Sequence, residues 1–218
     1  DIYYIQTYKK QFLDELSTKG VNVHYIDGTW ENYNKSLELL YCAGVKYIRA
    51  GLKWESIQKS DNIFDFSKHD KWIKLANDYG INIVLNFSGM GNLVGQDKRV
   101  NTEEELKKFS VFCNNAVKQY PQIKKFELFN EPNLDYNNWL YATEKDFGWY
   151  MKSLKTLKES INNNNKNAEV LAGSSASGDL KNRSVSSKEF FEMICNNDGY
   201  EIMDSYAYHT YDILNDKN

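Results

Sequence analysis

The chain has 218 residues, enough to bury one substantial core, and its hydrophobic (41%) and charged (26%) fractions are those of a globular domain. A formal net charge of −3 provides no basic field for nucleic acid or an anionic membrane surface, which argues against both as main partners. No apolar run is long enough to span a membrane. Cys42, Cys113 and Cys195 are too few and too scattered for a disulfide framework or a zinc site, so neither a metal nor another cofactor is expected.

The aromatic fraction is high at 15%, with 16 Tyr and 5 Trp. An aromatic core explains this composition, and so does a cleft lined with aromatic stacking surfaces. The chain begins at Asp1 without a methionine, which is consistent with a processed or engineered start. A removed secretion signal would fit, so a secreted or cell-surface location is favoured.

In chain order, residues 1–20 predict an N-terminal arm or helix that precedes one domain over residues 21–218. Within this domain, short β-rich runs alternate with amphipathic helical stretches. Thr102 and Glu105 form a capping-box pattern at the start of one of these helices. The predicted strands are Val21–Ile26, Val45–Leu52, Ile81–Phe87, Ile123–Asn130, Ala168–Ser174 and Ile202–Tyr208.

This alternation predicts an α/β fold with parallel strands and right-handed crossovers. Six β/α units are present, whereas a (β/α)8 barrel needs eight. A barrel of this TIM type would therefore be incomplete in this chain, with strands seven and eight missing. The remaining strands would belong to a missing segment or to a second chain. The rival is an open six-stranded sheet, which would leave two unpaired edges.

The fourth predicted strand runs directly into Asn130, Glu131 and Pro132. Proline has no N–H for the sheet, so the strand should end there and leave an amide and a carboxylate at its carboxyl end. Both side chains can face one cleft only if the strand end departs from β geometry, because neighbouring residues in a strand point to opposite faces. The carboxyl ends of the strands are where barrel enzymes carry their chemistry.

The Asn-Glu-Pro element resembles the fourth strand of the (β/α)8 retaining glycoside hydrolases of clan A. The segment Gly-Val-Lys-Tyr-Ile-Arg and residues 65–67 look most like family 39-type β-glycosidases and bacterial exopolysaccharide hydrolases. The resemblance covers Val21 to Tyr211. It implies hydrolysis of β-glycosidic bonds in an oligo- or polysaccharide, with a carbohydrate as the binding partner.

The resemblance makes Glu131 the general acid/base. Retaining hydrolysis needs one carboxylic acid to protonate the leaving oxygen and a second carboxylate to attack the sugar. The resemblance also implies that Asn130 hydrogen-bonds the sugar 2-hydroxyl. The structural alternatives are a salt-bridged carboxylate for Glu131 and an amide that satisfies the turn for Asn130.

Arg49 lies near the end of the second strand. A charge in an apolar strand requires an acidic partner. The resemblance implies that this partner is the nucleophile carboxylate, and a structural ion pair in the barrel mouth is the alternative.

His209 and Tyr211 look like the His-x-Tyr element on the sixth strand of related glycosidases, where the pair contacts sugar and nucleophile. His24 ends the first strand and is expected to line the sugar site, whereas His69 lies at a helix start and is expected at the surface. The three histidines show no metal-binding spacing, which disfavours a metal hydrolase.

Trp54 and Asn86 follow the second and third strands and are further candidates for substrate binding. Trp54 could instead anchor a loop, and Asn86 could instead stabilise a turn.

The chain departs from the family at the nucleophile, which is a Glu at the end of the seventh strand. Glu192, Glu201 and Asp204 lie before the sixth strand or near its start, and none is a plausible substitute. The sequence therefore predicts a glycosidase that holds the acid/base without the nucleophile. The alternatives are a carbohydrate-binding barrel or inactive fragment, and an unrelated α/β-barrel hydrolase.

Overall fold

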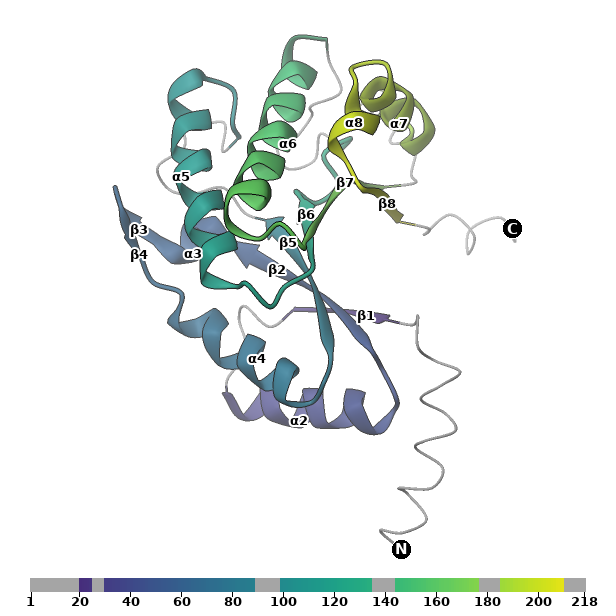
Figure 1. The fold of residues 1–218 in the computed structure, drawn as a ribbon. Helices are drawn as coiled ribbons and strands as arrows, with labels where there is room; N and C mark the ends of the chain where they lie inside the picture. The colour runs from purple at the N-terminus through teal and green to yellow at the C-terminus, as the bar shows by residue number, and fades with distance from the viewer. Residues whose placement is uncertain (1–19, 25–29, 89–98, 135–143, 177–184, 210–218) are drawn as a thin grey trace, which may run out of the picture.

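The computed structural model describes residues 20–24, 30–88, 99–134, 144–176 and 185–209. The predicted arm over residues 1–20 lies outside these ranges, except for Gly20. The described residues form one six-stranded parallel sheet in the order β1-β2-β5-β6-β7-β8, and a small antiparallel hairpin, β3-β4. The sheet curves like part of a barrel wall, with the helices on its outer side (Figure 1).

The six predicted strands are all present in the sheet. Their bounds are β1 (Gly20–Val23), β2 (Tyr47–Lys53), β5 (Asn82–Ser88), β6 (Lys125–Leu128), β7 (Glu169–Ala176) and β8 (Ser205–His209). The hairpin of β3 (Gln58–Ser60) and β4 (Ile63–Phe64) was not predicted, because its strands are too short to show a hydrophobic pattern. The predicted α/β fold, a TIM-type barrel of about six units, is confirmed.

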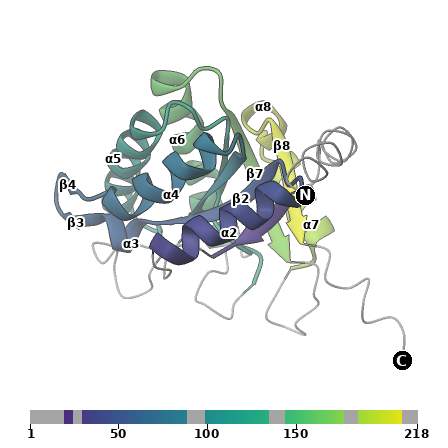
Figure 2. The same cartoon turned by 90° about the horizontal axis from the view of Figure 1, so that it is seen from below.

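The helices line the outer side of the curved sheet, which is seen from below in Figure 2. They are α2 (Trp30–Cys42), α3 (Trp54–Ile57), α4 (Ser67–Asp78), α5 (Glu103–Gln119), α6 (Glu144–Asn164), α7 (Ser187–Cys195) and α8 (Gly199–Ile202). At the start of α5, the Thr102 side chain accepts a hydrogen bond from the Glu105 N–H, as its capping pattern predicts. The Glu105 carboxylate caps the N–H of Asn101 at 2.9 Å. No helix in the described ranges is long and apolar enough to cross a membrane.

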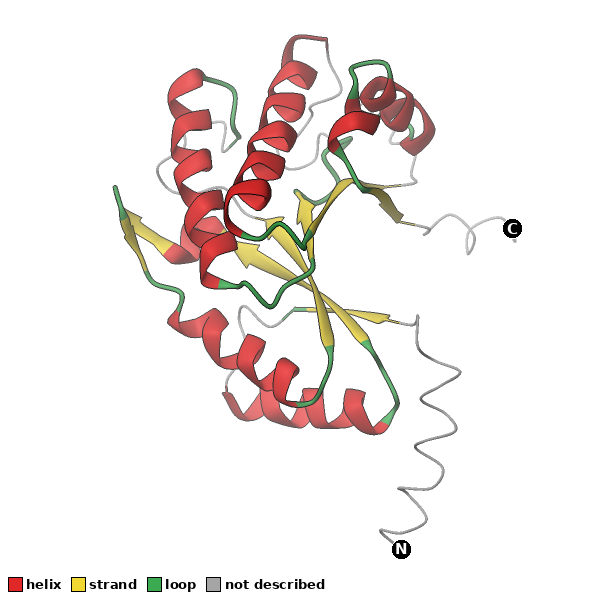
Figure 3. Cartoon of the chain, in the orientation of Figure 1, coloured by secondary structure: helices red, strands yellow, loops and turns green. Residues whose placement is uncertain are grey.

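Alternation along the strands separates a covered face from an inner face. In β2, Ile48, Ala50 and Leu52 are buried under the helices, while the residues between them are only partly buried. Aromatic side chains fill the layer between sheet and helices, where Trp54 stacks on Phe112 with ring centroids 5.3 Å apart. The helices lie outside the strands throughout (Figure 3). Much of the aromatic content therefore belongs to the core.

Three non-glycine residues with left-handed backbone lie near the carboxyl ends of β6 and β7. They are Phe129 (φ 58°), Glu131 (φ 50°) and Ser174 (φ 49°). The predicted fourth strand therefore stops at Leu128, two residues earlier than expected, because Phe129 leaves β geometry. Such strained residues persist where the surrounding structure holds them, and they concentrate at functional sites.

His69 is a correction to the sequence prediction, because it is buried rather than at the surface. It is only 2% exposed, and among the described residues neither ring nitrogen has a hydrogen-bond partner. Burial lowers the pKa of His69 to about 4. A surface position was expected because His69 lies at a helix start, but its side chain faces the core side of α4.

Burial of His69 predicts acid sensitivity of the fold. The unfolded chain takes up a proton at this group below pH ~6.5, whereas the folded chain does so only near its lowered pKa. The contribution of neutral His69 to the free energy of unfolding is therefore fully present above pH ~6.5. It is lost as the pH falls toward the pKa of His69 in the folded chain, and the loss is about 2 kcal/mol at pH 5. Urea unfolding at pH 7.5 and pH 5.0 should show this loss in the wild type and a smaller loss in His69→Phe. Equal losses in both proteins would contradict the prediction.

Candidate active site

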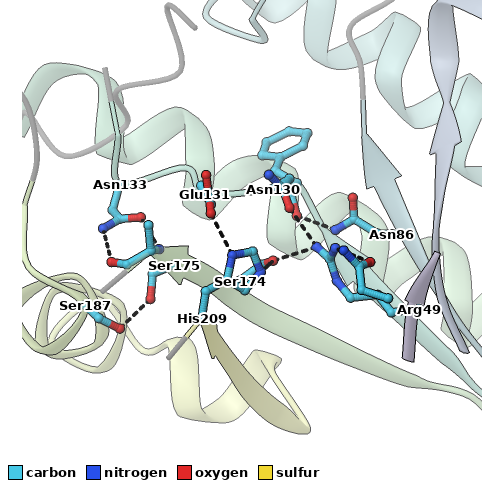
Figure 4. A network of polar contacts seen from close by, with 12 residues as sticks. Arg49, Asn86, Asn130, Glu131, Asn133, Ser174, Ser175, Ser187 and His209 are labelled. Carbon is cyan, nitrogen blue, oxygen red and sulfur yellow. Dashed lines mark hydrogen bonds and ion pairs between the residues drawn. The ribbon is translucent and has the colours of Figure 1, made fainter. Parts of the chain in front are cut away.

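Polar side chains from β2, β5, β6, β7 and β8 converge at the carboxyl end of the sheet (Figure 4). They form a connected network of two parts. One part centres on Arg49 and Glu127, the other on Glu131 and His209, and Ser174 joins them. The expected gathering of polar residues at this end of a parallel sheet is thus present.

Glu131 lies within this network, with a side chain only 12% exposed. Its Oε1 is 2.7 Å from Nδ1 of His209, and its backbone N–H donates to the carbonyl of Ser174 at 2.9 Å. The left-handed backbone at Phe129 and Glu131 turns the chain so that both Asn130 and Glu131 join the network. The departure from β geometry that the sequence required is therefore present.

Ser174 is a fully buried residue at a bulge in β7, where the pairing with β8 shifts between Gly173 and Ser175. Its Oγ accepts a hydrogen bond from Nη2 of Arg49 at 2.8 Å and lies 3.3 Å from Nε2 of His209. Gly173 has φ 88°, and a Cβ there would lie 2.4 Å from the ring of Tyr206. Only glycine fits this position, so Gly173 permits the bulge that places Ser174.

The contacts run from Ser174 to His209 and from His209 to Glu131. This is the order of the nucleophile, base and carboxylate in a catalytic triad for acyl transfer. Two observations argue against that chemistry here. Ser174 is 0% exposed, so a substrate carbonyl cannot reach its Oγ. Its Oγ already accepts from a guanidinium, which makes the oxygen a poor nucleophile. The arrangement is better suited to holding His209 against Glu131.

Arg49 has an acidic partner, as a charge in an apolar strand requires. Its Nε donates to Oε2 of Glu127 at 2.6 Å, and the Glu127 side chain is 2% exposed. Its other nitrogens reach Asn22 at 3.2 Å and Asn130 at 2.9 Å. Among the described residues, the ion pair that the structure shows for Arg49 is the one with Glu127. Contact with a nucleophile carboxylate stays a prediction.

The remaining candidates differ in how close they lie to the network. Asn86 belongs to it, with an amide that donates to Glu127 at 2.6 Å and also to the Phe129 carbonyl. Trp54 is 1% exposed and packs among the helices, which favours the anchoring alternative. His24 is exposed just after β1. Tyr211 lies outside the described residues.

Sequence reasoning missed Glu127 and Ser174. A carboxylate between Phe126 and Leu128 in an apolar strand is a usable signal, because such a charge needs a partner. The stronger Asn-Glu-Pro motif begins only three residues later, at Asn130. Ser174 gives no such signal, since its role depends on a bulge that no pattern in the sequence indicates.

The geometry defines a class of protein: an α/β barrel with a polar network at the carboxyl ends of its strands. The family model described as "Cellulase (glycosyl hydrolase family 5)" matches residues 7–215. The chain therefore belongs to glycosyl hydrolase family 5, and the expected membership of clan A is confirmed. No curated protein matches the chain.

Solved structures share the fold. A family 39 glycoside hydrolase from Bacteroides cellulosilyticus WH2 matches with a TM-score of 0.68 and 22% identity, over 87% of this chain and 37% of that chain. A β-glycosidase from Pyrococcus horikoshii matches with a TM-score of 0.57 and 17% identity, over 79% of this chain and 44% of that chain. A monomeric β-xylosidase from Caulobacter crescentus CB15 matches with a TM-score of 0.58 and 16% identity, over 88% of this chain and 41% of that chain. The chain thus spans less than half the length of each of these proteins.

Proposed function

We propose that this chain carries the acid/base part of a retaining glycosidase that acts on β-glycosidic bonds of an oligo- or polysaccharide. The observation that carries the proposal is the placement of Glu131: a mostly buried carboxylate at the carboxyl end of the sheet, 2.7 Å from His209. Family membership supports the reaction class.

In this reaction Glu131 first donates its proton to the leaving oxygen while a second carboxylate bonds to the anomeric carbon and the glycosidic bond breaks. Glu131 then takes a proton from water, whose oxygen displaces the second carboxylate. In retaining enzymes the two carboxyl groups are about 5–5.5 Å apart. The second carboxylate must therefore lie across a sugar-sized gap from Glu131.

Four described carboxylates near the later strands or in the network, namely Glu192, Glu201, Asp204 and Glu127, do not suit the second role. Glu192 lies on α7 and Glu201 on α8, and Asp204 pairs with Lys158 at 2.7 Å before β8 begins. Glu127 is buried and already holds Arg49 and Asn86. We propose that the nucleophile belongs to a further segment or to a second chain that completes the barrel.

Two features of the sheet support this completion. Within the described residues β1 and β8 each pair with one strand, so both edges are open. The inner face has an open hollow of about 520 Å³ whose lining includes Tyr47, Val84 and Leu171, side chains that a closed barrel would bury. A second hollow, of about 620 Å³, lies beside Phe191, Tyr206 and Tyr208 near the β8 edge.

The test compares residues 1–218 with the complete polypeptide of the open reading frame, using a panel of aryl β-glycosides. The complete polypeptide should hydrolyse at least one of them, and residues 1–218 alone should not. Robust hydrolysis by residues 1–218, abolished in Glu131→Gln, would contradict the missing nucleophile. Sugar binding without hydrolysis by the complete polypeptide would support the alternative, a non-catalytic carbohydrate-binding barrel.

A further inference from the structure

Glu127 is a buried carboxylate in the polar network, where it contacts Arg49 and Asn86. Its neighbours Phe126 and Leu128 are both fully buried, so Glu127 points toward the inner face of the sheet. Its Oε2 accepts from Nε of Arg49 and from the amide of Asn86, each at 2.6 Å. Such a buried charge is retained at a cost in desolvation, which calls for a function.

Through Arg49, Glu127 reaches the predicted sugar-binding amide. The guanidinium is planar and rigid, so anchoring Nε at Glu127 also sets the position of Nη2. Nη2 donates to Oδ1 of Asn130 at 2.9 Å. A guanidinium has no acceptor, so the atom of Asn130 that faces it must be the carbonyl oxygen. The NH2 group of Asn130 is thereby left to donate to a ligand.

Asn86 provides a second path from Glu127 to the same residue. Its amide donates to Glu127 and to the carbonyl of Phe129, the residue directly before Asn130. Phe129 has a left-handed backbone, and this contact helps to hold it. Glu127 therefore fixes both the backbone approach to Asn130 and the orientation of its side chain.

We propose that Glu127 is a positioning residue that acts through Arg49 and Asn86. It locks Asn130 as a hydrogen-bond donor, so the site selects a sugar with a hydroxyl oxygen at the contacted position. This inference rests on the proposed function. It adds a residue that selects for that hydroxyl without touching the sugar.

The experiment measures discrimination by the complete polypeptide between two probes. One is the 4-nitrophenyl β-glycoside it hydrolyses fastest, and the other is the 2-deoxy analogue of that glycoside. Glu127→Gln should lower the ratio of the two kcat/KM values about tenfold, because the loosened Asn130 no longer makes its full contact. In an Asn130→Ala background, Glu127→Gln should leave the ratio unchanged. A purely structural role would slow both probes equally and leave the ratio intact.

Glu169→Gln is the matched control. Glu169 forms an ion pair with Lys125 between neighbouring strands, away from the network. The Glu169→Gln variant should therefore show the same ratio of the two kcat/KM values as the wild type. If Glu127→Gln does not fold, Arg49→Lys reports on the same path, since lysine lacks the fork that links Glu127 to Asn130. An unchanged ratio in the tested variant would overturn the inference. Failure of the proposed function would instead appear as no glycoside turnover by the wild type, or as full activity in Glu131→Gln.

Discussion

Glu131→Gln should lower kcat/KM of the complete polypeptide for an unactivated oligosaccharide by about 10²–10⁴-fold. Glutamine keeps the size of the side chain but cannot give up a proton to the leaving oxygen. It also cannot accept a proton from the attacking water, so both halves of the reaction suffer. Initial rates with a reducing-sugar assay measure the effect.

The control for this variant is Glu159→Gln, which makes the same chemical change at an exposed position on α6. It should leave kcat/KM unchanged. Thermal unfolding of both variants separates a loss of chemistry from a loss of fold. A Glu131→Gln protein that is folded and retains more than about a tenth of the wild-type rate would rule out general acid/base catalysis by this residue.

Arg49→Leu should destabilise the fold by about 3–5 kcal/mol. The change removes the cation from Glu127 and leaves a carboxylate that is 2% exposed with its charge uncompensated. The double variant Arg49→Leu/Glu127→Gln should recover part of the loss, because the buried group is then neutral. Urea unfolding of the wild type, both single variants and the double variant gives the coupling free energy, expected at about 1–3 kcal/mol.

Lys74→Leu provides the comparison for an ion pair at the surface. The change breaks the ion pair between Lys74 and Asp78, whose side chains are 76% and 55% exposed, respectively. It should change the free energy of unfolding by less than about 1 kcal/mol. If Arg49→Leu costs no more than Lys74→Leu, the ion pair in the barrel mouth does not hold the site together.

The sequence predicted the fold well because its signals are local. Each of the six strands is an apolar run bounded by helical periodicity, and each lies within a few residues of its predicted position. The Asn-Glu-Pro motif placed Glu131 just after the fourth strand, although that strand already ends at Leu128, where Phe129 leaves β geometry. The need of Arg49 for an acidic partner was also predictable, since burying a charge is costly in any fold.

Other features depend on contacts between residues far apart in the chain. The partner of Arg49 is 78 residues away, and no local pattern chooses Glu127 over other carboxylates. The contact of His209 with Glu131 was not foreseen either; the resemblance had implied contact with sugar and nucleophile. His69 and Trp54 are buried because of the helices packed around them, which hydrophobic spacing alone did not indicate.

The most direct test of Glu131 as the proton donor is a leaving-group series of aryl β-glycosides, measured on the complete polypeptide with and without Glu131→Gln. Wild-type kcat/KM should depend weakly on the pKa of the leaving phenol, because the departing oxygen is protonated as the bond breaks. In Glu131→Gln the dependence should become steep, with near-normal rates only for the most acidic phenols. Parallel lines for the two proteins would show that no proton passes from residue 131 to the leaving group.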